Sequence, residues 1–269
     1  PNRVLAASCA GRTPRESPAG RVNVLGAGFD AVTAEQALCL ARRWLQGETG
    51  LHQVVTANPE TILKARRSPE LQRVLECAAL VVADGVGVVW ASRRLGTALP
   101  GRVAGIELAE GLLEYCAASG YPVFLLGGRP AAPGRAGVAE AAAVALAGRW
   151  PGLPVAGTWH GYIGPGDEPA VLEALARARP ALLLCGMGCP RQELWLARHA
   201  SFLEQCGVRV AIGVGGALDV WSGQVRRAPA LFRRLGLEWL WRLGQDPRRV
   251  GRQLQLVRFV LEVLTHARS

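Results

Sequence analysis

The sequence predicts an α/β fold with a Rossmann-like, mostly parallel sheet, helices on both faces and a C-terminal helical appendage. Three observations lead to this fold class. Short apolar runs alternate with amphipathic stretches of helical period, glycine-rich or polar loops follow the apolar runs, and the pattern is purely helical from residue 228 onward. A chain of 269 residues holds one domain with an appendage and is too short for two full-sized domains.

The apolar runs are the expected strands, and capping residues mark the expected helices. We expect strands at residues 22–25, 53–57, 79–83, 123–126, 154–158, 181–185 and 208–214. Thr33 and Gln36 form a capping-box pattern that opens a helix to about residue 45, and Pro59 stands where a first-turn proline is tolerated. Pro190 occupies a similar position ahead of a helix over residues 193–204. These patterns do not define the order of the strands.

Charge is distributed unevenly along the chain. We predict a flexible leader at residues 1–20, a catalytic domain at residues 21–220 and an Arg-rich, membrane-associating appendage at residues 221–269. The appendage has ten arginines against three acidic residues, so it carries +7 of the net charge of +10. This concentration of positive charge indicates an anionic partner, which could be a nucleic acid, a phospholipid surface or a phosphorylated substrate.

Two apolar stripes run along the appendage. One contains Leu231, Leu235 and Trp239, and the other contains Val250, Leu254, Val257, Leu261 and Leu264. The stripes could pack against the catalytic domain while the arginines are solvated, or they could dock on an anionic membrane surface. Both alternatives stay open, and both can hold on different helix faces.

Cysteine and histidine usage points to a reducing compartment. The seven cysteines are scattered without a C-x-x-C pair and there are only four histidines, so neither a disulfide framework nor a zinc site is predicted. The longest apolar runs have the length of a strand, so we expect no transmembrane helix. A cytoplasmic protein fits these features best.

Polar or glycine-rich loops follow several of the expected strands. Ligands of open α/β sheets bind beyond the carboxyl ends of the strands, so these loops hold the candidate site. The candidates are Thr56, Asn58, Asp84, Gly85, Gly127, Gly128, Gly188, Gln192, Gly215, Gly216 and Asp219. Glycines allow backbone N–H groups to approach phosphate, which favours a nucleotide or sugar nucleotide, although for any single loop a tight turn is the simpler explanation.

Asp84 is the candidate general base. It directly follows an apolar run, so its carboxylate should lie at the ligand edge of the sheet, where it could accept a proton from a hydroxyl nucleophile. An N-cap for a helix beginning near Val86 is an equally consistent alternative. Thr56 and Asn58 could likewise cap the next helix, and Gln192 could simply be a polar first-turn residue.

No D-x-D carboxylate pair occurs in the sequence, which argues against Mg²⁺ or Mn²⁺ held between two aspartates and a diphosphate. We therefore expect a metal-independent enzyme without a cofactor. A leaving diphosphate would then need cationic side chains, and Arg242, Arg249 and Arg252 are candidates because guanidinium binds phosphate through two hydrogen bonds. The alternative for each of them is a solvated arginine on a membrane-facing helix.

Two other classes of protein are compatible with some of these features. Residues 26–31 satisfy the dinucleotide pattern G-x-G-x-x-A, which would favour a nicotinamide-dependent oxidoreductase. However, the helix signal begins only at Thr33, and no acidic residue closes the second strand. The basic appendage would suit a nucleic-acid-binding module, but its apolar stripes make a membrane or domain surface the better partner, so we expect no nucleic acid.

Taken together and in chain order, the loops resemble the WecG/TagA/CpsF glycosyltransferase family, glycosyltransferase family 26, over residues 22–264. The segments that carry the resemblance are TANPE at 56–60, ADGVGVVW at 83–90, RVAG at 102–105, LLGG at 125–128, TWHGY at 158–162, GCPRQE at 188–193, GVGGALD at 213–219, RRAP at 226–229 and LEWLWR at 237–242. The family often has Pro where this chain has Ala83, and His where it has Trp159. These departures leave the donor sugar open.

The resemblance implies an inverting, metal-independent transfer in cell-surface polymer synthesis, such as that of teichoic acid. The donor would be a UDP-sugar, commonly UDP-N-acetylmannosamine or its uronic acid, and the acceptor an N-acetylglucosaminyl diphosphate polyprenol. It also implies a peripheral enzyme at the inner face of the cell membrane, with an anionic membrane surface and a homo-oligomer as expected partners.

The resemblance also implies roles for particular residues. Asp84 would be the base, assisted by Thr56 and Gln192 as further catalytic residues. Tyr162 and Asp219 would hold the uridine. The remaining substrate-binding residues would be Asn58, Gly85, Arg102, Gly127, Gly128, Gly188, Gly215 and Gly216, together with Arg242, Arg249 and Arg252, which would steady the diphosphate.

Overall fold

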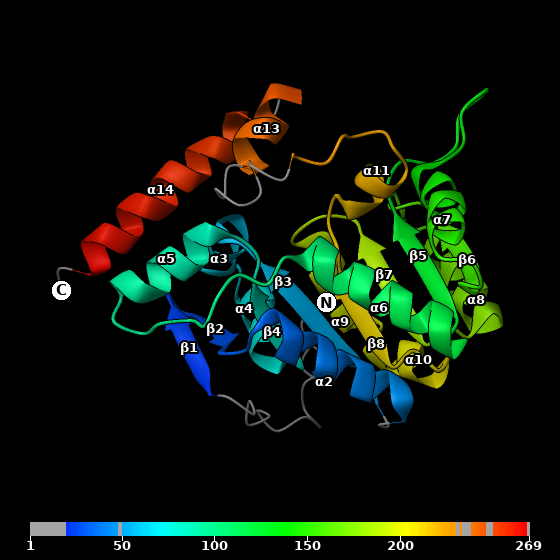
Figure 1. Cartoon of the computed structure of the whole chain (residues 1–269), viewed down its shortest axis with the longest axis horizontal. Helices are drawn as coiled ribbons and strands as arrows, with labels where there is room; N and C mark the ends of the chain where they lie inside the picture. The colour runs from blue at the N-terminus through cyan, green and yellow to red at the C-terminus, as the bar shows by residue number, and fades with distance from the viewer. Residues whose placement is uncertain (1–19, 48–49, 230–231, 233–237, 246–249, 268–269) are drawn as a thin grey trace.

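A computed structural model describes residues 20–47, 50–229, 232, 238–245 and 250–267 (Figure 1). Almost all of the predicted leader, residues 1–19, lies outside the described residues. The division of the chain at residues 20/21 and 220/221 stays a prediction.

A parallel sheet of six strands forms the centre of the molecule, so the predicted fold class is confirmed (Figure 1). Its strands are β3 (His52–Ala57), β4 (Leu80–Ala83), β5 (Val123–Gly127), β6 (Val155–Trp159), β7 (Leu182–Gly186) and β8 (Val210–Gly213). They lie in the order β4-β3-β8-β7-β5-β6, and every neighbouring pair is parallel. The loops after all six strands therefore meet at one edge, which is where the sequence analysis expects the site.

The first predicted strand does not join this sheet, so that part of the expectation is wrong. β1 (Arg21–Val24) pairs antiparallel with β2 (Ala27–Asp30) in a separate two-stranded hairpin. The two turn residues, Leu25 and Gly26, have φ values of 53° and 93°, a conformation that tight hairpins require. The glycines of residues 26–31 thus belong to a hairpin and not to a dinucleotide loop, which removes the only support for the oxidoreductase alternative.

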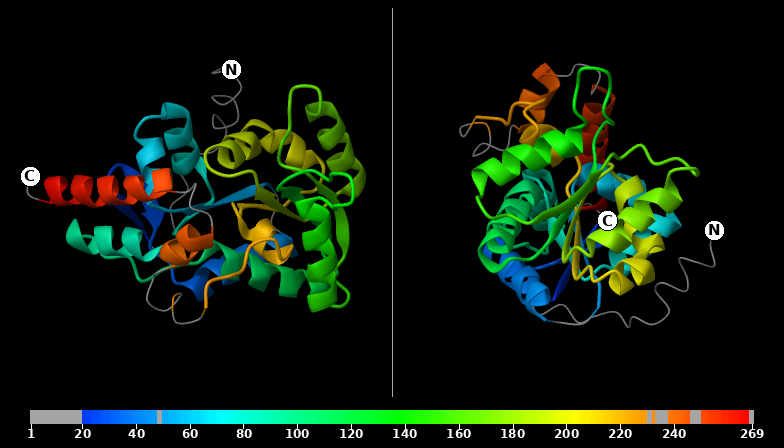
Figure 2. Two further views of the ribbon diagram at one scale, coloured as in Figure 1. Left: turned by 90° about the horizontal axis from the view of Figure 1, so that it is seen from above. Right: turned by 90° about the vertical axis from the view of Figure 1, so that its right-hand side faces the viewer.

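Helices cover both faces of the sheet, as Figure 2 shows. One face is covered by α2 (Ala34–Gln46), α6 (Gly105–Ser119), α7 (Val138–Arg149) and α11 (Ala217–Trp221). The other is covered by α3 (Pro59–Ala65), α4 (Pro69–Cys77), α8 (Glu168–Ala178), α9 (Arg191–Arg198) and α10 (Ala200–Gln205). Side chains of β7 alternate between the two cores, with Leu182 and Leu184 in one and Leu183 and Cys185 in the other.

The predicted helix starts are largely confirmed. The capping box of α2 is present, because Gln36 N donates to Thr33 Oγ1 at 3.2 Å and Thr33 N donates to Gln36 Oε1 at 2.8 Å. Asn58 caps α3, whose first residue is Pro59. The single helix expected over residues 193–204 is instead two helices, α9 and α10, which meet at His199.

The last helix, α14 (Val250–His266), lies beside α3 and α5 (Val86–Arg94), at the β4 end of the sheet (Figure 1). It follows α13 (Glu238–Gln245). Phe259 and Val263 of α14 are fully buried against this end of the core. Val257 and Leu261, which belong to the predicted stripe, are 59% and 58% exposed. The stripe therefore does not face the domain at these two positions.

Candidate active site

A cavity of about 660 Å³ opens at the carboxyl edge of β3, β4, β7 and β8, under residues of α13 and α14. Nine of the predicted site residues line it: Thr56, Asn58, Asp84, Gly85, Arg102, Gly188, Gln192, Gly215 and Gly216. They come from five segments that are far apart in the sequence, namely those after β3, β4, β7 and β8 and the segment before α6. The cavity size suits a ligand of at least nucleotide size.

Asp84 stands at the end of β4 with its carboxylate at the cavity. Asp84 N donates to Ala57 O at 2.9 Å, which continues the pairing of β3 and β4 and brings the side chain to the sheet edge. The carboxyl group is 32% exposed. The N-cap of α5 is Gly85, and no side-chain hydrogen bond caps this helix, so the capping alternative for Asp84 is wrong.

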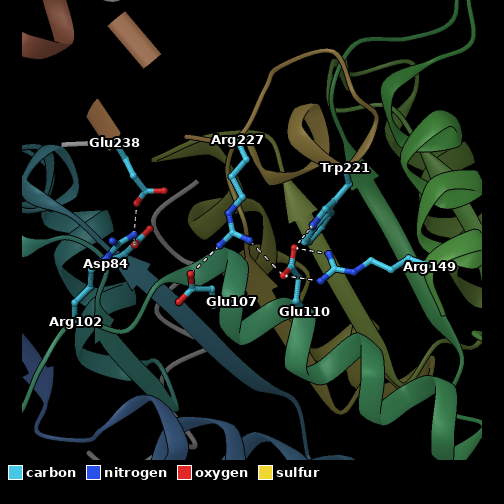
Figure 3. A network of polar contacts seen from close by, with 8 residues as sticks. All are labelled: Asp84, Arg102, Glu107, Glu110, Arg149, Trp221, Arg227 and Glu238. Atoms are coloured by element: carbon cyan, nitrogen blue, oxygen red, sulfur yellow. Dashed lines mark hydrogen bonds and ion pairs between the residues drawn. The ribbon is translucent and has the colours of Figure 1, made fainter. Parts of the chain in front are cut away.

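Arg102 lies between two carboxylates. Val103 N donates to Ala83 O at 2.9 Å, so this loop runs alongside the end of β4. Arg102 Nη2 consequently lies 3.9 Å from Asp84 Oδ1, and it also forms an ion pair with Glu238 of α13 (Figure 3). The Arg102 guanidinium therefore places a positive charge beside the Asp84 carboxyl at the cavity.

A second polar network lies beside this one and fixes the chain that leads toward α13 (Figure 3). Arg227 donates to Glu107 Oε1 at 2.8 Å and lies 3.5 Å from Glu110 Oε2. Glu110 Oε1 also accepts from Trp221 Nε1 at 3.1 Å and from Arg149 at 3.0 Å. Arg227 of the RRAP segment therefore anchors this segment to α6.

Thr56 and Asn58 have structural bonds in addition to their places at the cavity. Thr56 Oγ1 donates to Gly213 O at 2.9 Å, which joins the ends of β3 and β8. Asn58 Oδ1 accepts from Thr61 N at 3.0 Å, so the capping alternative for Asn58 is confirmed. Asn58 still lines the cavity, so a cap and a ligand contact are compatible for this side chain.

Gln192 joins the loops after β7 and β8. Its side chain is almost fully buried, and its Oε1 accepts from Gly188 N at 3.0 Å and from Gly215 N at 3.2 Å. Both glycines have positive φ values, 78° and 51°, a backbone region that glycine adopts at low cost. The amide of Gln192 therefore sets the distance between two loops of the site.

Glu193 is a site residue that the sequence analysis missed as a candidate. It lines the cavity, is 2% exposed, and its Oε1 accepts from Gln192 Nε2 at 2.7 Å. Burial raises the pKa of the Glu193 carboxyl above its ordinary value of 4.5. The only sequence signal is a Gln-Glu pair in the first turn after a glycine-rich loop, which alone does not distinguish a buried acid from an exposed one.

Four predicted residues do not line this cavity. Gly127 and Gly128 follow β5, where Gly128 N donates to Gly186 O at 3.2 Å and Gly128 O accepts from Gly161 N at 2.8 Å. Tyr162 is 60% exposed. Asp219 lies in α11, which begins one residue after Gly216. The uridine-binding role of Tyr162 and Asp219 and the substrate-binding role of Gly127 and Gly128 stay predictions.

Three of the predicted site residues are arginines of the appendage. Arg249 lies outside the described residues, and the structure describes only the backbone of Arg242 in α13 and Arg252 in α14. Described side chains of both helices nevertheless reach the cavity, namely Glu238, Gln255, Leu256 and Val260. The appendage thus forms part of the cavity wall.

The fold and this cavity define an α/β enzyme in which a carboxylate, amide groups and glycine-rich loops converge on a cavity of at least nucleotide size. The sequence pattern of the glycosyl transferase WecG/TagA/CpsF family matches residues 22–269, and the chain belongs to this family. It is therefore a glycosyltransferase.

Similar proteins include N-acetylglucosaminyldiphosphoundecaprenol N-acetyl-beta-D-mannosaminyltransferases of Staphylococcus aureus strains MRSA252, MW2 and NCTC 8325. Each is 36% identical to this chain over 248 residues, which is 92% of this chain and 93% of the relative. The similarity therefore extends over almost the full length of both proteins.

Among the described residues, no group of three or more His, Cys, Asp and Glu side chains could hold a metal ion. Within the same part of the chain, every helix is too short or too polar to cross a membrane.

Proposed function

We propose that this glycosyltransferase moves N-acetylmannosamine, or a related N-acetylhexosamine or uronic acid, from a UDP-sugar to an N-acetylglucosaminyl diphosphate polyprenol in cell-surface polymer synthesis. The 36% identity to mannosaminyltransferases over 92% of the chain supports the substrates. The single observation that carries the mechanism is that Asp84 and Arg102 lie together at the cavity with Gln192.

In the proposed reaction Asp84 is the general base. Its carboxylate accepts the proton of the acceptor hydroxyl, and the hydroxyl oxygen forms a bond to the anomeric carbon of the donor sugar. The bond from that carbon to the diphosphate oxygen breaks at the same time, and UDP leaves with the electron pair. Attack from the side opposite the leaving group inverts the configuration at the anomeric carbon.

The leaving UDP carries the negative charge that the protein must stabilise. We propose that arginines do this without a metal ion: Arg102 at the cavity, and Arg242, Arg249 and Arg252 of the appendage. Preorganised guanidinium groups and backbone N–H donors stabilise charge that develops in a transition state. The N–H groups of Gly188 and Gly215 donate to Gln192, so other backbone N–H groups of the loops after β7 and β8 would supply these donors.

We also propose that the enzyme works as a peripheral protein on the inner face of the cell membrane, where its lipid-linked acceptor would be found, and that it self-associates. Several large apolar side chains near the cavity are more than a third exposed: Val86, Trp90, Leu240, Val257 and Leu261. Together with the +7 charge of residues 221–269, they would allow binding to an anionic membrane surface.

The test is UDP release by the wild-type protein from a panel of UDP-sugars, with and without a polyprenyl-diphospho-N-acetylglucosamine analogue, in the presence of EDTA. We expect release that depends on the acceptor and is fastest with a UDP-N-acetylhexosamine. Failure of every donor would contradict the proposed substrates. Release that EDTA abolishes and Mg²⁺ restores would contradict metal independence.

A further inference from the structure

Glu193 is a carboxylic acid buried directly beneath the cavity. It lies in the first turn of α9, and its side chain is more fully buried than that of any other carboxylate among the described residues at the cavity. Its Oε2 has no hydrogen-bond partner in the part of the chain that the structure describes. A buried carboxyl of this kind is costly, so a role beyond solubility or surface charge is expected for it.

Its described partner is the amide of Gln192. Gln192 Oε1 already accepts two backbone N–H groups, from Gly188 and Gly215. Gln192 Nε2 donates one of its two hydrogens to Glu193 Oε1 at 2.7 Å. Among the described contacts, the second hydrogen of Nε2 is therefore the part of this amide that can still meet a ligand in the cavity.

The pair is enclosed on its other sides. A Cβ atom at Gly213 would lie 2.5 Å from Gln192 Nε2 and 3.3 Å from Glu193 Oε1, so glycine is the residue that leaves room for both groups. Gln53 Nε2 donates to the backbone oxygen of Glu193 at 3.1 Å and holds the start of α9 against β3. The Gln192 amide therefore has little freedom to take another position.

We propose that Glu193 is a positioning residue for the transfer reaction: by accepting one N–H of Gln192, it directs the other N–H of that amide at the bound sugar or diphosphate. This inference rests on the proposed function. Glu193 does not touch the reacting atoms, and it acts only through Gln192. Displacing a group that orients the substrate by about 1 Å can reduce the rate about 100-fold.

The acceptor that Glu193 offers does not depend on its protonation state. Burial raises the pKa of the Glu193 carboxyl, and its hydrogen bond from Gln192 and the charge of Lys64 oppose this effect without cancelling it. Charged or neutral, the carboxyl presents an oxygen that accepts from Gln192 Nε2, as the amide oxygen of a glutamine would. The conservative variant Glu193→Gln should therefore preserve the function, whereas a side chain without an acceptor should not.

The experiment is a double-mutant cycle between Gln192→Ala and Glu193→Met, measured as kcat and KM for acceptor-dependent UDP release. We expect Glu193→Met to lower kcat by about 10- to 100-fold in the wild-type background and by less than about threefold in the Gln192→Ala background. Glu193→Gln should keep kcat within about threefold of the wild type. Asp30→Asn is the matched control, because Asp30 is also buried but accepts from Val81 N at 2.6 Å, away from the cavity.

Two results would overturn the proposal. One is an equal loss of kcat from Glu193→Met in both backgrounds, which would mean that Glu193 does not act through Gln192. The other, which does not require the Met variant to fold, is a loss of more than about tenfold in Glu193→Gln. If the wild-type protein releases no UDP with any donor, the proposed function fails. The same double-mutant cycle is then measured as free energy of unfolding. Additive effects of the two substitutions would show that the side chains of Gln192 and Glu193 are not coupled and would overturn the positioning role.

Discussion

Glycine has different roles in two halves of the carboxyl edge of the sheet. The cavity half contains the loops after β7 and β8, and the β5 half contains the end of β5. Beyond β7 and β8, Gly188 and Gly215 present backbone N–H groups to Gln192 beside the cavity. At the end of β5, a Cβ atom at Gly127 would lie 2.6 Å from the backbone oxygen of Gly186 at the end of β7, so glycine is there to let two strand ends pack. Gly188 and Gly215 thus support a polar site, whereas Gly127 allows close packing. Polar side chains, not glycines, mark which loops form the cavity.

The largest effect on stability is expected from Gly127→Ala, because the added Cβ would overlap the backbone of the neighbouring loop. Overpacking of this kind costs about 3 kcal/mol of unfolding free energy. Urea unfolding measured by circular dichroism checks the value. A loss below about 1 kcal/mol would mean that the β5 half of the edge is not closely packed. It would contradict the packing role of Gly127.

The outer surfaces of the two halves should differ as well. Val257 and Leu261 are exposed on α14 near the cavity, and Val144 is 76% exposed on α7 in the β5 half. The double variant Val257→Ser/Leu261→Ser should bind vesicles that contain anionic lipid about tenfold more weakly, since it loses apolar surface that would enter the interface. Co-sedimentation with such vesicles measures the affinity. Val144→Ser is the control, and an equal loss in this control would contradict a membrane-facing α14.

A smaller effect on stability is expected from Gly215→Ala. No atom lies within 4 Å of the added Cβ, so the cost comes only from the φ of 51° and amounts to about 1 kcal/mol. The same urea unfolding experiment provides the value. A cost as large as that of Gly127→Ala would show that glycine is needed for packing at position 215 as well.

The pH dependence of stability should report the buried acid of the cavity half. The folded pKa of Glu193 is raised above 4.5, so the stability of the wild type relative to Glu193→Gln is highest below pH 4.5. It falls as the pH rises from 4.5 to the folded pKa, by at most about 1.4 kcal/mol per pH unit, and is constant above it. Two other titratable groups lower the pKa of Glu193, namely Cys189 and Lys64. Both are unchanged in Glu193→Gln. A difference in unfolding free energy between the wild type and Glu193→Gln that stays the same at all pH values would contradict a raised pKa.

The sequence was sufficient for the fold class and for most of the cavity. Apolar runs followed by polar loops located Thr56, Asp84 and Gln192 at one edge, because the carboxyl ends of parallel strands must meet there. Local patterns could not show that β1 pairs with β2, because an apolar run in a hairpin and one in a parallel sheet look alike.

Contacts between distant segments were not predictable in the same way. Glu193 reads as an ordinary first-turn acid until its burial against β3 and β8 is known. The ion pair between Arg102 and Glu238 joins two segments separated by more than a hundred residues, and neither carries a signal for the other. Such pairs depend on tertiary packing, which spacing along one sequence does not encode.

The most direct test of the central claim is the rate of acceptor-dependent UDP release by Asp84→Asn, with Asp167→Asn as the matched control. Asp167 accepts from Gly164 N at 3.0 Å before α8, away from the cavity. If Asp84 is the general base, Asp84→Asn lowers kcat about 100- to 10,000-fold while UDP affinity and unfolding free energy stay near the wild-type values, and Asp167→Asn retains activity. Full activity in Asp84→Asn would contradict the assignment of the base.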